Sequence, residues 1–176
     1  MTFDYRKFYD LEKYLLAEVG PRFRETRVIC PIDFYLIIIW KANRAKTRLR
    51  DRLNKQPGGF AEAVEGIAAS LHTSACPMGR LEVLMKKWGF RLPMASAILT
   101  VFYPDDFGVY DVRVCEQLGA FKELAGRQFS DGLWKDYQRF LNTVKATAPE
   151  GFSLRDKDRY LWGRSFYEAT MRDLGG

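Results

Sequence analysis

The stretch that decides the predicted fold is Gly89–Cys115, GFRLPMASAILTVFYPDDFGVYDVRVC. It begins with a glycine turn, continues as an apolar segment in which Pro93 suits the first turn of a helix, and then enters a loop with proline and glycine. Asp111 follows as the N-cap of another predicted helix. Backbone amides at a turn that opens into a helix N-terminus form a natural site for a phosphate group. The stretch therefore predicts a helical frame that places one acid near a bound anion.

The composition limits what the chain as a whole can be. Its 176 residues, 47% of them hydrophobic, predict one folded domain over 1–176, with the turn and the acid inside 81–118. No apolar run is long enough to span a membrane, and the N-terminus lacks the apolar core of a secretion signal. The three cysteines are far apart and odd in number, so they match neither a disulfide framework nor a metal site. We expect a cytoplasmic monomer that binds no membrane, metal or cofactor.

Positive charge is concentrated in one segment. Residues 41–55 hold seven basic side chains and one acid, an excess equal to the formal net charge of +6 of the whole chain. Such density is typical of a nucleic-acid surface, and also of a solvated helix face paired with acids elsewhere. The cations of this segment that we expect to contact nucleic acid are Lys41, Arg44, Arg48 and Arg50.

Helical spacing of apolar residues recurs along the chain, and no convincing pair of strands is present, so the predicted fold class is all-α. Gly20-Pro21 is expected to end the first helix, with a loop or extended segment over 22–31, and Asp33 is expected to cap the next helix. The predicted helices cover 3–19, 34 to the residue before Pro57, 60–71, 79–88, 93 to the stop at Pro104, 112–118, 131–146 and 154–171.

The order and spacing of these features resemble the helix-hairpin-helix DNA glycosylases, the superfamily that includes the 8-oxoguanine glycosylases. The family's hairpin has the pattern L-x-G-V-G-x-K-T-A, on which Gly89 matches the first glycine and Ala95 the alanine. Residues 103–107 match the loop that follows, and Asp111 matches the aspartate that opens the next helix. Residues 158–162 also resemble a C-terminal helix of small relatives. The close match covers about a quarter of the chain.

The resemblance implies a helix-hairpin-helix fold, DNA as the partner and Asp111 as the catalytic acid. An aspartate beside the anomeric carbon stabilises the positive charge that develops on the sugar and orients or deprotonates the attacking water. The lysine with which bifunctional members form an imine falls at Pro93, so the expected enzyme is monofunctional. Arg91 replaces the second hairpin glycine and would add a charged contact to the phosphate.

Other predicted site residues surround this acid. The residues expected to bind a phosphate are Gly89, Phe90, Arg91 and Leu92, with Lys86 and Lys87 just before them as further cations and as remote substitutes for the missing lysine. The aromatic residues considered for a base pocket are Tyr35, Trp40, Trp88, Tyr110 and Trp162.

Two other functions fit the same residues. In the first, the protein is a non-catalytic nucleic-acid-binding module, in which Asp111 only caps a helix and Gly89 only ends one. In the second, it is a helical scaffold whose basic segment meets an acidic protein partner. Loss of base release on replacing Asp111 would separate the enzyme from both.

Overall fold

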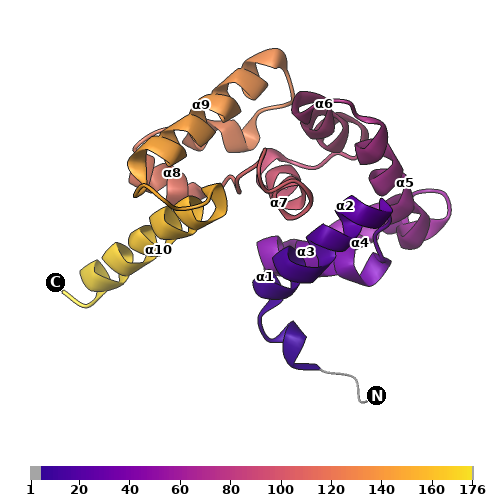
Figure 1. Ribbon diagram of the computed structural model, residues 1–176, viewed down its shortest axis with the longest axis horizontal. Helices are drawn as coiled ribbons and strands as arrows, with labels where there is room; N and C mark the ends of the chain where they lie inside the picture. The colour runs from indigo at the N-terminus through magenta and orange to yellow at the C-terminus, as the bar shows by residue number, and fades with distance from the viewer. Residues whose placement is uncertain (1–4, 176) are drawn as a thin grey trace.

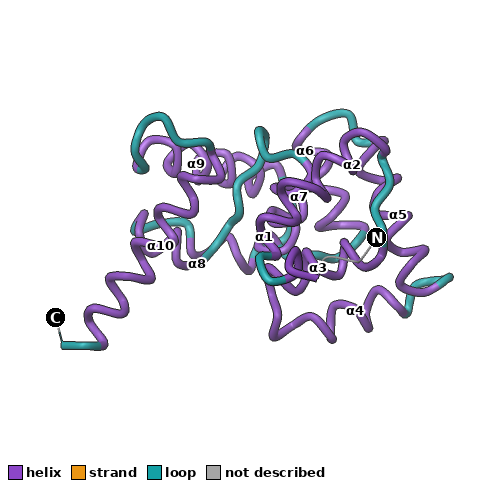
Figure 2. Tube along the Cα trace, turned by 60° about the horizontal axis from the view of Figure 1, so that its bottom comes forward, coloured by secondary structure: helices purple, strands orange, loops and turns teal. Residues whose placement is uncertain are grey.

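The computed structural model describes residues 5–175, which form helices and loops without a β-strand (Figure 2). The all-α prediction is therefore confirmed for this part of the chain. The first predicted helix begins at Phe3, which lies outside the described residues. In chain order the elements are η1 (Tyr5–Phe8), α1 (Leu11–Tyr14), η2 (Leu15–Val19), α2 (Gly20–Thr26), α3 (Pro31–Ala42), η3 (Asn43–Ala45), α4 (Lys46–Asn54), α5 (Gly59–Thr73), α6 (Pro77–Glu82), η4 (Val83–Lys87), α7 (Leu92–Phe102), α8 (Val112–Leu118), η5 (Lys122–Gly126), α9 (Asp131–Thr147) and α10 (Leu154–Asp173).

Helix α7 lies at the centre of the molecule, between α1–α5 on one side and α8–α10 on the other (Figure 1). Every residue of α7 except Pro93 is buried. The helix packs against α2, α3 and α6 and against the short helices η2, η4 and η5. Because close-packed interiors tolerate little displacement, a helix enclosed in this way fixes the segments at both its ends. The hairpin turn (residues 89–92) leads into α7, and the loop before Asp111 leaves it.

The first long helix does not end at Gly20-Pro21, contrary to the prediction. Residues 15–19 form the π-helical turn η2, in which the amide of Gly20 donates to the carbonyl of Leu15. Pro21 then falls in the first turn of α2, where its missing N–H costs nothing. Helix α2 ends at Thr26, and Arg27 takes a left-handed conformation with φ 63°. The non-helical segment predicted over 22–31 is therefore confined to its second half.

Asp33 does not cap the third helix, contrary to the prediction. Helix α3 begins at Pro31, so Asp33 lies in its first turn and is buried. Its carboxylate accepts hydrogen bonds from the Tyr14 hydroxyl at 2.8 Å and the Arg22 guanidinium at 2.5 Å. A buried carboxylate requires such partners, and these join the N-terminal helices to α3.

The sequence predicts that the basic segment continues one helix from residue 34, but in the structure this helix is broken. The chain leaves α3 after Ala42, where φ is −147°, forms the short turn η3 and starts again as α4. Lys41 therefore belongs to the largely buried helix α3, whereas α4 buries only Leu53. This break separates Lys41 from the other cations of the segment and directs it toward a different part of the molecule.

The later helices agree with the sequence prediction to within two residues at their ends. His72, one residue beyond the predicted end of its helix, lies in the last turn of α5. Asp111 is the N-cap of α8, as predicted, and Pro93 lies in the first turn of α7. The short helix η5 has no counterpart in the prediction.

Gly20 lies where α2 approaches the end of α7. A Cβ atom at this position would stand 2.2 Å from the backbone oxygen of Val101. Because this neighbour is backbone rather than a flexible side chain, only glycine permits the approach. In contrast, a Cβ atom at Gly163 in α10 would meet nothing within 4 Å.

We expect Gly20→Ala to lower the free energy of unfolding by about 1–3 kcal/mol, because the added methyl group forces α2 away from α7. The matched control, Gly163→Ala, should raise it by about 0.5–1 kcal/mol, because alanine has the better helix propensity. Urea denaturation followed by circular dichroism measures both changes. Equal stabilities of the two variants would contradict the close approach of the two helices.

Candidate functional site

The segment that leads to Asp111 is held from three helices. It is extended, and its backbone groups bond to one side chain each from α7, α9 and α10. The bonds are Tyr137 Oη to Gly108 O (2.6 Å), Val109 N to Asp158 Oδ2 (3.2 Å) and Tyr110 N to Ser96 Oγ (2.9 Å). Because all three partners are buried, Asp111 starts from a backbone position with little freedom.

Both carboxylate oxygens of Asp111 have a partner. Oδ1 accepts the backbone N–H of Arg113 at 3.0 Å, which is the N-cap bond of α8. Oδ2 accepts the Lys41 ammonium at 2.6 Å, and the same ammonium donates to the Tyr110 carbonyl at 3.2 Å. The side chain of Lys41 is 11% exposed and that of Asp111 24%. The carboxylate therefore faces solvent at the edge of a buried ion pair.

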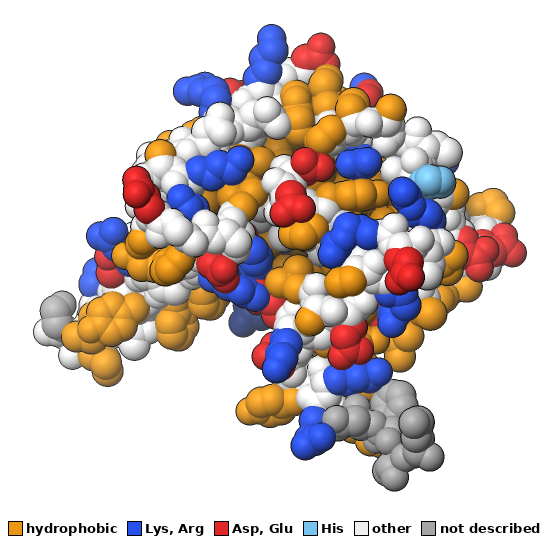
Figure 3. All heavy atoms as spheres, viewed as in Figure 1, with side chains coloured by type: hydrophobic (Ala, Val, Ile, Leu, Met, Phe, Trp, Pro, Cys, Tyr) orange, Lys and Arg blue, Asp and Glu red, His pale blue; other side chains and the backbone are white. Residues whose placement is uncertain are grey.

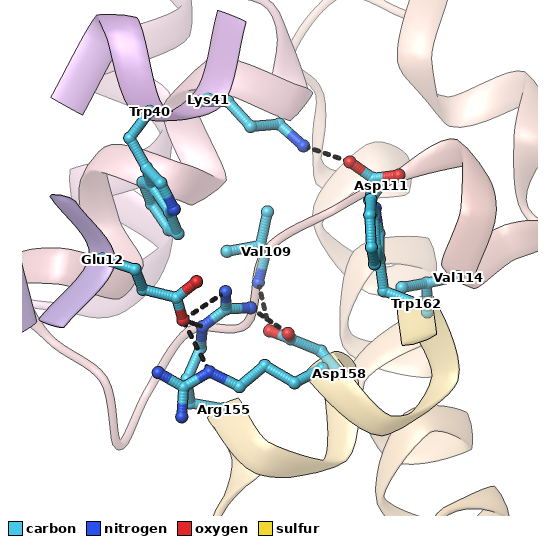
Figure 4. Close-up of a pocket in the computed structure, with 10 residues that line it drawn as sticks. Glu12, Trp40, Lys41, Val109, Asp111, Val114, Arg155, Asp158 and Trp162 are labelled. Carbon is cyan, nitrogen blue, oxygen red and sulfur yellow. Dashed lines mark hydrogen bonds and ion pairs between the residues drawn. The ribbon is translucent and has the colours of Figure 1, made fainter. Parts of the chain in front are cut away.

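A cavity of about 410 Å³ opens beside this ion pair. Trp40 and Trp162 stand on opposite sides of it, and Lys41 points across its top toward Asp111 (Figure 4). The volume is within the range of small-molecule sites in proteins. We call this cavity the Asp111 pocket; it is lined by Glu12, Trp40, Lys41, Val109, Asp111, Val114, Arg155, Asp158, Arg159 and Trp162.

Of the aromatic residues considered for a base pocket, only Trp40 and Trp162 line this cavity. Tyr110 is buried in the core, where its hydroxyl donates to the Phe121 carbonyl at 2.6 Å. Tyr35 packs edge-on against Phe60. The Trp88 indole N–H faces Ser70 at 3.4 Å.

The floor of the Asp111 pocket is a network of two carboxylates and two guanidinium groups. Glu12 Oε1 accepts from Arg155 Nη2 at 2.6 Å and from Arg159 Nε at 2.6 Å. Arg155 also pairs with Asp158, which bonds the Val109 amide on its other side (Figure 4). The network ties α1 to α10, two helices far apart in sequence, beneath the segment that leads to Asp111.

Asp158 is the one acid in this network that is almost wholly buried. Burial raises its pKa to about 7, against the opposing effects of the Arg155 charge and the Val109 N–H. The pocket therefore contains two carboxyl groups in different surroundings, one at its solvent edge and one in its floor. Sequence reasoning did not identify Asp158 as a pocket residue, because its role depends on the backbone of the distant loop between α7 and α8.

A second cavity, of about 510 Å³, lies between α4 and the hairpin turn. Four cations contribute to its walls, and the backbone of the hairpin turn forms one side. We call it the hairpin groove; its lining residues are Lys41, Ala42, Ala45, Arg48, Leu49, Arg52, Gly89, Phe90, Arg91, Pro93 and Met94.

Arg52 is the residue that joins α4 to the hairpin turn. Its guanidinium lies 4.9 Å from the centre of the Phe90 ring and donates to the Gly89 carbonyl at 2.6 Å. Its Nε and Nη2 are buried and have no hydrogen-bond partner. Burial, and then the nearby Arg48 charge, lower the pKa of Arg52. Buried N–H groups of a guanidinium without acceptors are costly, and an ordered water or a bound anion would relieve that cost.

The structure places the four residues predicted to contact a phosphate, Gly89 to Leu92, in different surroundings. Gly89 has φ 64°, and a Cβ atom there would stand 2.5 Å from Arg52 Nη1. The sequence predicts that the amide of Phe90 contacts a phosphate. In the structure this amide already donates to the Leu84 carbonyl at 3.0 Å. Arg91 lines the groove but donates to the Gly126 carbonyl at 3.0 Å. Leu92 is fully buried, backbone included, and so presents no group to the groove surface.

The predicted cations divide into two sets. Lys41 and Arg48 line the hairpin groove, whereas Arg44 does not and Arg50 is paired with Asp51 at 2.6 Å. Arg52, which we did not single out from the sequence, lines the groove, whereas Arg50 does not. Residues 48 and 52 are one helical turn apart, so helical phase alone separates them from residue 50.

Lys86 and Lys87 point away from both cavities. Lys86 pairs with Glu82 at 2.7 Å, one turn earlier in the chain, and Lys87 donates to the Ser70 hydroxyl at 3.1 Å. Neither lies where it could replace the hairpin lysine of bifunctional glycosylases, because neither lines the Asp111 pocket.

Among residues 5–175, Lys41 is the only one that lines both cavities. Its ammonium is bound to Asp111 on the side of the pocket, and its stem borders the groove. The groove and the pocket are therefore neighbours across one side chain.

Within the described residues, no group of three or more His, Cys, Asp or Glu side chains is arranged to hold a metal ion. No helix in the same part of the chain has the length and apolar character to cross a membrane. Comparison with protein-family models, curated proteins and solved structures finds no match to this chain. Its function is therefore inferred from the geometry of the site.

We expect stability to depend on pH through Asp158. The folded protein keeps the Asp158 proton up to about pH 7, whereas the unfolded chain releases it near the ordinary value of 3.8. The folded state thus binds more protons between these values, and the stability from this group falls as the pH rises through them. Relative to Asp158→Asn, the wild type should lose on the order of 1–3 kcal/mol between pH 5 and pH 8.

Urea denaturation of both proteins at several pH values measures this difference. The Asn side chain retains an acceptor for the Val109 amide, so the comparison isolates the titration. Parallel stability curves for the two proteins would contradict a raised pKa of Asp158.

Proposed function

We propose that this protein is a DNA glycosylase of the helix-hairpin-helix class that hydrolyses the N-glycosidic bond of a damaged or modified base. One observation carries the proposal: a cationic groove beside the hairpin turn adjoins, through Lys41, a pocket with a carboxylate at its edge. A strand whose phosphate occupied the groove would have a neighbouring nucleotide at the pocket. No family match supports the class, so the proposal rests on this geometry and on the resemblance of residues 89–111.

Asp111 has the chemistry that the reaction needs. As the glycosidic bond breaks, positive charge develops on the sugar, and a fixed carboxylate stabilises that charge. The same carboxylate can orient or deprotonate the water that attacks the anomeric carbon. The N-cap bond to Arg113 holds Oδ1, while Oδ2 faces Lys41 and the pocket. Once Lys41 turns toward a phosphate, Oδ2 is left to face the sugar.

The pocket and the groove supply the two other requirements of such an enzyme. A base must leave the stack before its glycosidic bond can be reached, and aromatic side chains receive it. Trp40 and Trp162 stand on the two sides of the Asp111 pocket (Figure 4). In the groove, the unpartnered N–H groups of Arg52 provide donors for a phosphate.

We propose that the enzyme is monofunctional, because Pro93 stands where the resemblance would place the imine-forming lysine. The amine nearest to the carboxylate is Lys41, which is held in an ion pair and bonded to the Tyr110 carbonyl. The product would then be an abasic site with an intact strand, which hot alkali cleaves.

We expect Asp111→Asn to slow base release by about 10²–10⁴-fold, the usual contribution of a positioned acid or base. Asparagine caps helices as well as aspartate does, so this change removes the charge but leaves the cap of α8. Base release is measured on a panel of duplexes with damaged and mispaired bases, with hot alkali to reveal abasic sites. The matched control is Asp105→Asn, on the exposed loop that precedes the pocket segment.

Base release that survives in Asp111→Asn would contradict the proposed role of this residue. Strand breaks that form without alkali, and a covalent adduct trapped by borohydride, would contradict the monofunctional mechanism. In that case Lys41→Gln would identify the amine.

We expect Arg52→Gln to weaken duplex binding and to reduce the slope of log K against log salt by about one, as for the loss of one phosphate contact. Arg50→Gln makes the same change of charge on the same helix outside the groove, so it should leave both quantities close to wild type. Fluorescence anisotropy at several salt concentrations measures both, and circular dichroism checks the fold. Equal effects of the two variants would show that the groove does not bind the backbone.

The second candidate function is a non-catalytic nucleic-acid-binding module on the same fold. One observation favours it: both oxygens of Asp111 are already engaged, by the cap of α8 and by Lys41. In that case Asp111→Asn changes stability alone, and the Arg52→Gln variant still loses binding.

A further inference from the structure

Helix α10 leaves aromatic side chains exposed that the fold does not use. The helix extends from the body of the molecule to the C-terminal end (Figure 1), and it buries only Asp158, Leu161 and Ser165. Hydrophobic side chains gather over its outer part (Figure 3). Trp162 is 42% exposed and Phe166 51%. Large aromatic surfaces left in water on a folded domain mark a binding surface rather than a core.

Two of these rings form an ordered platform. The rings of Trp162 and Phe166 are one helical turn apart, with centroids 5.6 Å apart and planes that differ by 6°. The guanidinium of Arg113, at the start of α8, lies 5.4 Å from the Trp162 ring and 5.5 Å from the Phe166 ring. Two parallel rings with a guanidinium beside both of them combine flat π surfaces with positive charge. Unpaired bases stack on surfaces of this kind.

The platform is continuous with the Asp111 pocket. Trp162 lines that pocket and stacks on Phe166 on the outer side. Arg113 stands two residues after Asp111 and donates its backbone N–H to the capping carboxylate of that residue. A strand with one nucleotide in the pocket would therefore pass its next nucleotide over Phe166.

We propose that Trp162, Phe166 and Arg113 form a stacking site for an unpaired nucleotide next to the one held at Asp111, so that the preferred substrate is single-stranded or locally unpaired DNA. The inference rests on the proposed function, since it takes the strand in the pocket to be DNA. The occupant is a nucleic-acid base rather than an apolar protein surface, because the rings are parallel, crossed by a guanidinium and open toward a pocket that contains a second indole, Trp40. Stacking of this kind tolerates any base, since every base has a π face.

The test compares the affinity for a labelled single-stranded oligothymidylate with that for a fully paired duplex of the same length, by fluorescence anisotropy. We expect Phe166→Ala to weaken single-strand binding by about 5- to 100-fold, the effect of losing one stacked base, and to change duplex binding much less. Phe166→Leu keeps an apolar side chain without a π face, so it should lose as much as Phe166→Ala. Phe166→Tyr should bind like the wild type.

The matched control is Tyr167→Ala. Tyr167 is 63% exposed on the same helix, but it is offset by one residue from Phe166 and so faces another direction. We expect this variant to bind both probes as the wild type does.

Four results would overturn the stacking site. If Phe166→Ala binds the single strand like wild type while Arg52→Gln loses duplex binding, the platform is not used and the proposed function stands. If Phe166→Leu retains the affinity that Phe166→Ala loses, or if the wild type forms a dimer that Phe166→Ala dissociates, the surface is an apolar interface. If the wild type binds neither probe, the proposed function fails together with the stacking site.

Discussion

The burial of every residue of helix α7 except Pro93 is the constraint on which the rest of the structure depends. Its side chains meet neighbours on every side, so the segments at its two ends cannot move independently. At one end the hairpin turn is brought against Arg52 of α4. Beyond the other end the chain returns along the helix, and the Tyr110 amide bonds the Ser96 hydroxyl. The buried Ser96 hydroxyl of α7 thus helps to set where the acid emerges, and the ion pair of Lys41 with Asp111 joins α3 to the start of α8.

Most buried polar side chains of the described residues are matched, and the buried side-chain atoms that lack a hydrogen-bond partner are Arg52 Nε and Nη2, Arg80 Nε and the Tyr103 hydroxyl. Asp33 is matched by Arg22 and Tyr14, and the carboxylates in the floor of the Asp111 pocket are matched by Arg155 and Arg159. In contrast, Arg52 keeps two buried N–H groups without acceptors beside the hairpin turn. Unmatched buried donors in a well-matched structure point to a ligand that supplies the acceptors. The cation excess seen in the composition is therefore less informative than the position of the Arg52 guanidinium, two of whose nitrogens lack an acceptor beside the hairpin turn.

Much of the fold could be predicted from apolar spacing, because helices with a buried face repeat at a period that the sequence displays. The ends of α8 and the cap at Asp111 follow from local residues alone. The predictions of helix ends and caps are wrong where a tertiary contact outweighs the local preference of the residues. Pro21 does not end its helix because the preceding turn widens, and Asp33 pairs with distant residues instead of capping. The sequence singled out Asp111 and Lys41, but not Arg52, Ser96 or Asp158, because the roles of these three depend on backbone groups of loops that are distant in sequence.

The most direct test of the central claim, that the groove and the pocket hold adjacent parts of one DNA strand, is a crystal structure of Asp111→Asn with an oligonucleotide that contains an abasic-site analogue. We expect a phosphate within hydrogen-bond distance of the Arg52 guanidinium in the hairpin groove. We expect the sugar of the analogue in van der Waals contact with the side chain at position 111, between Trp40 and Trp162. DNA bound on another face, or a sugar held away from position 111 while a phosphate occupies the groove, would contradict the claim that these residues form a glycosylase site.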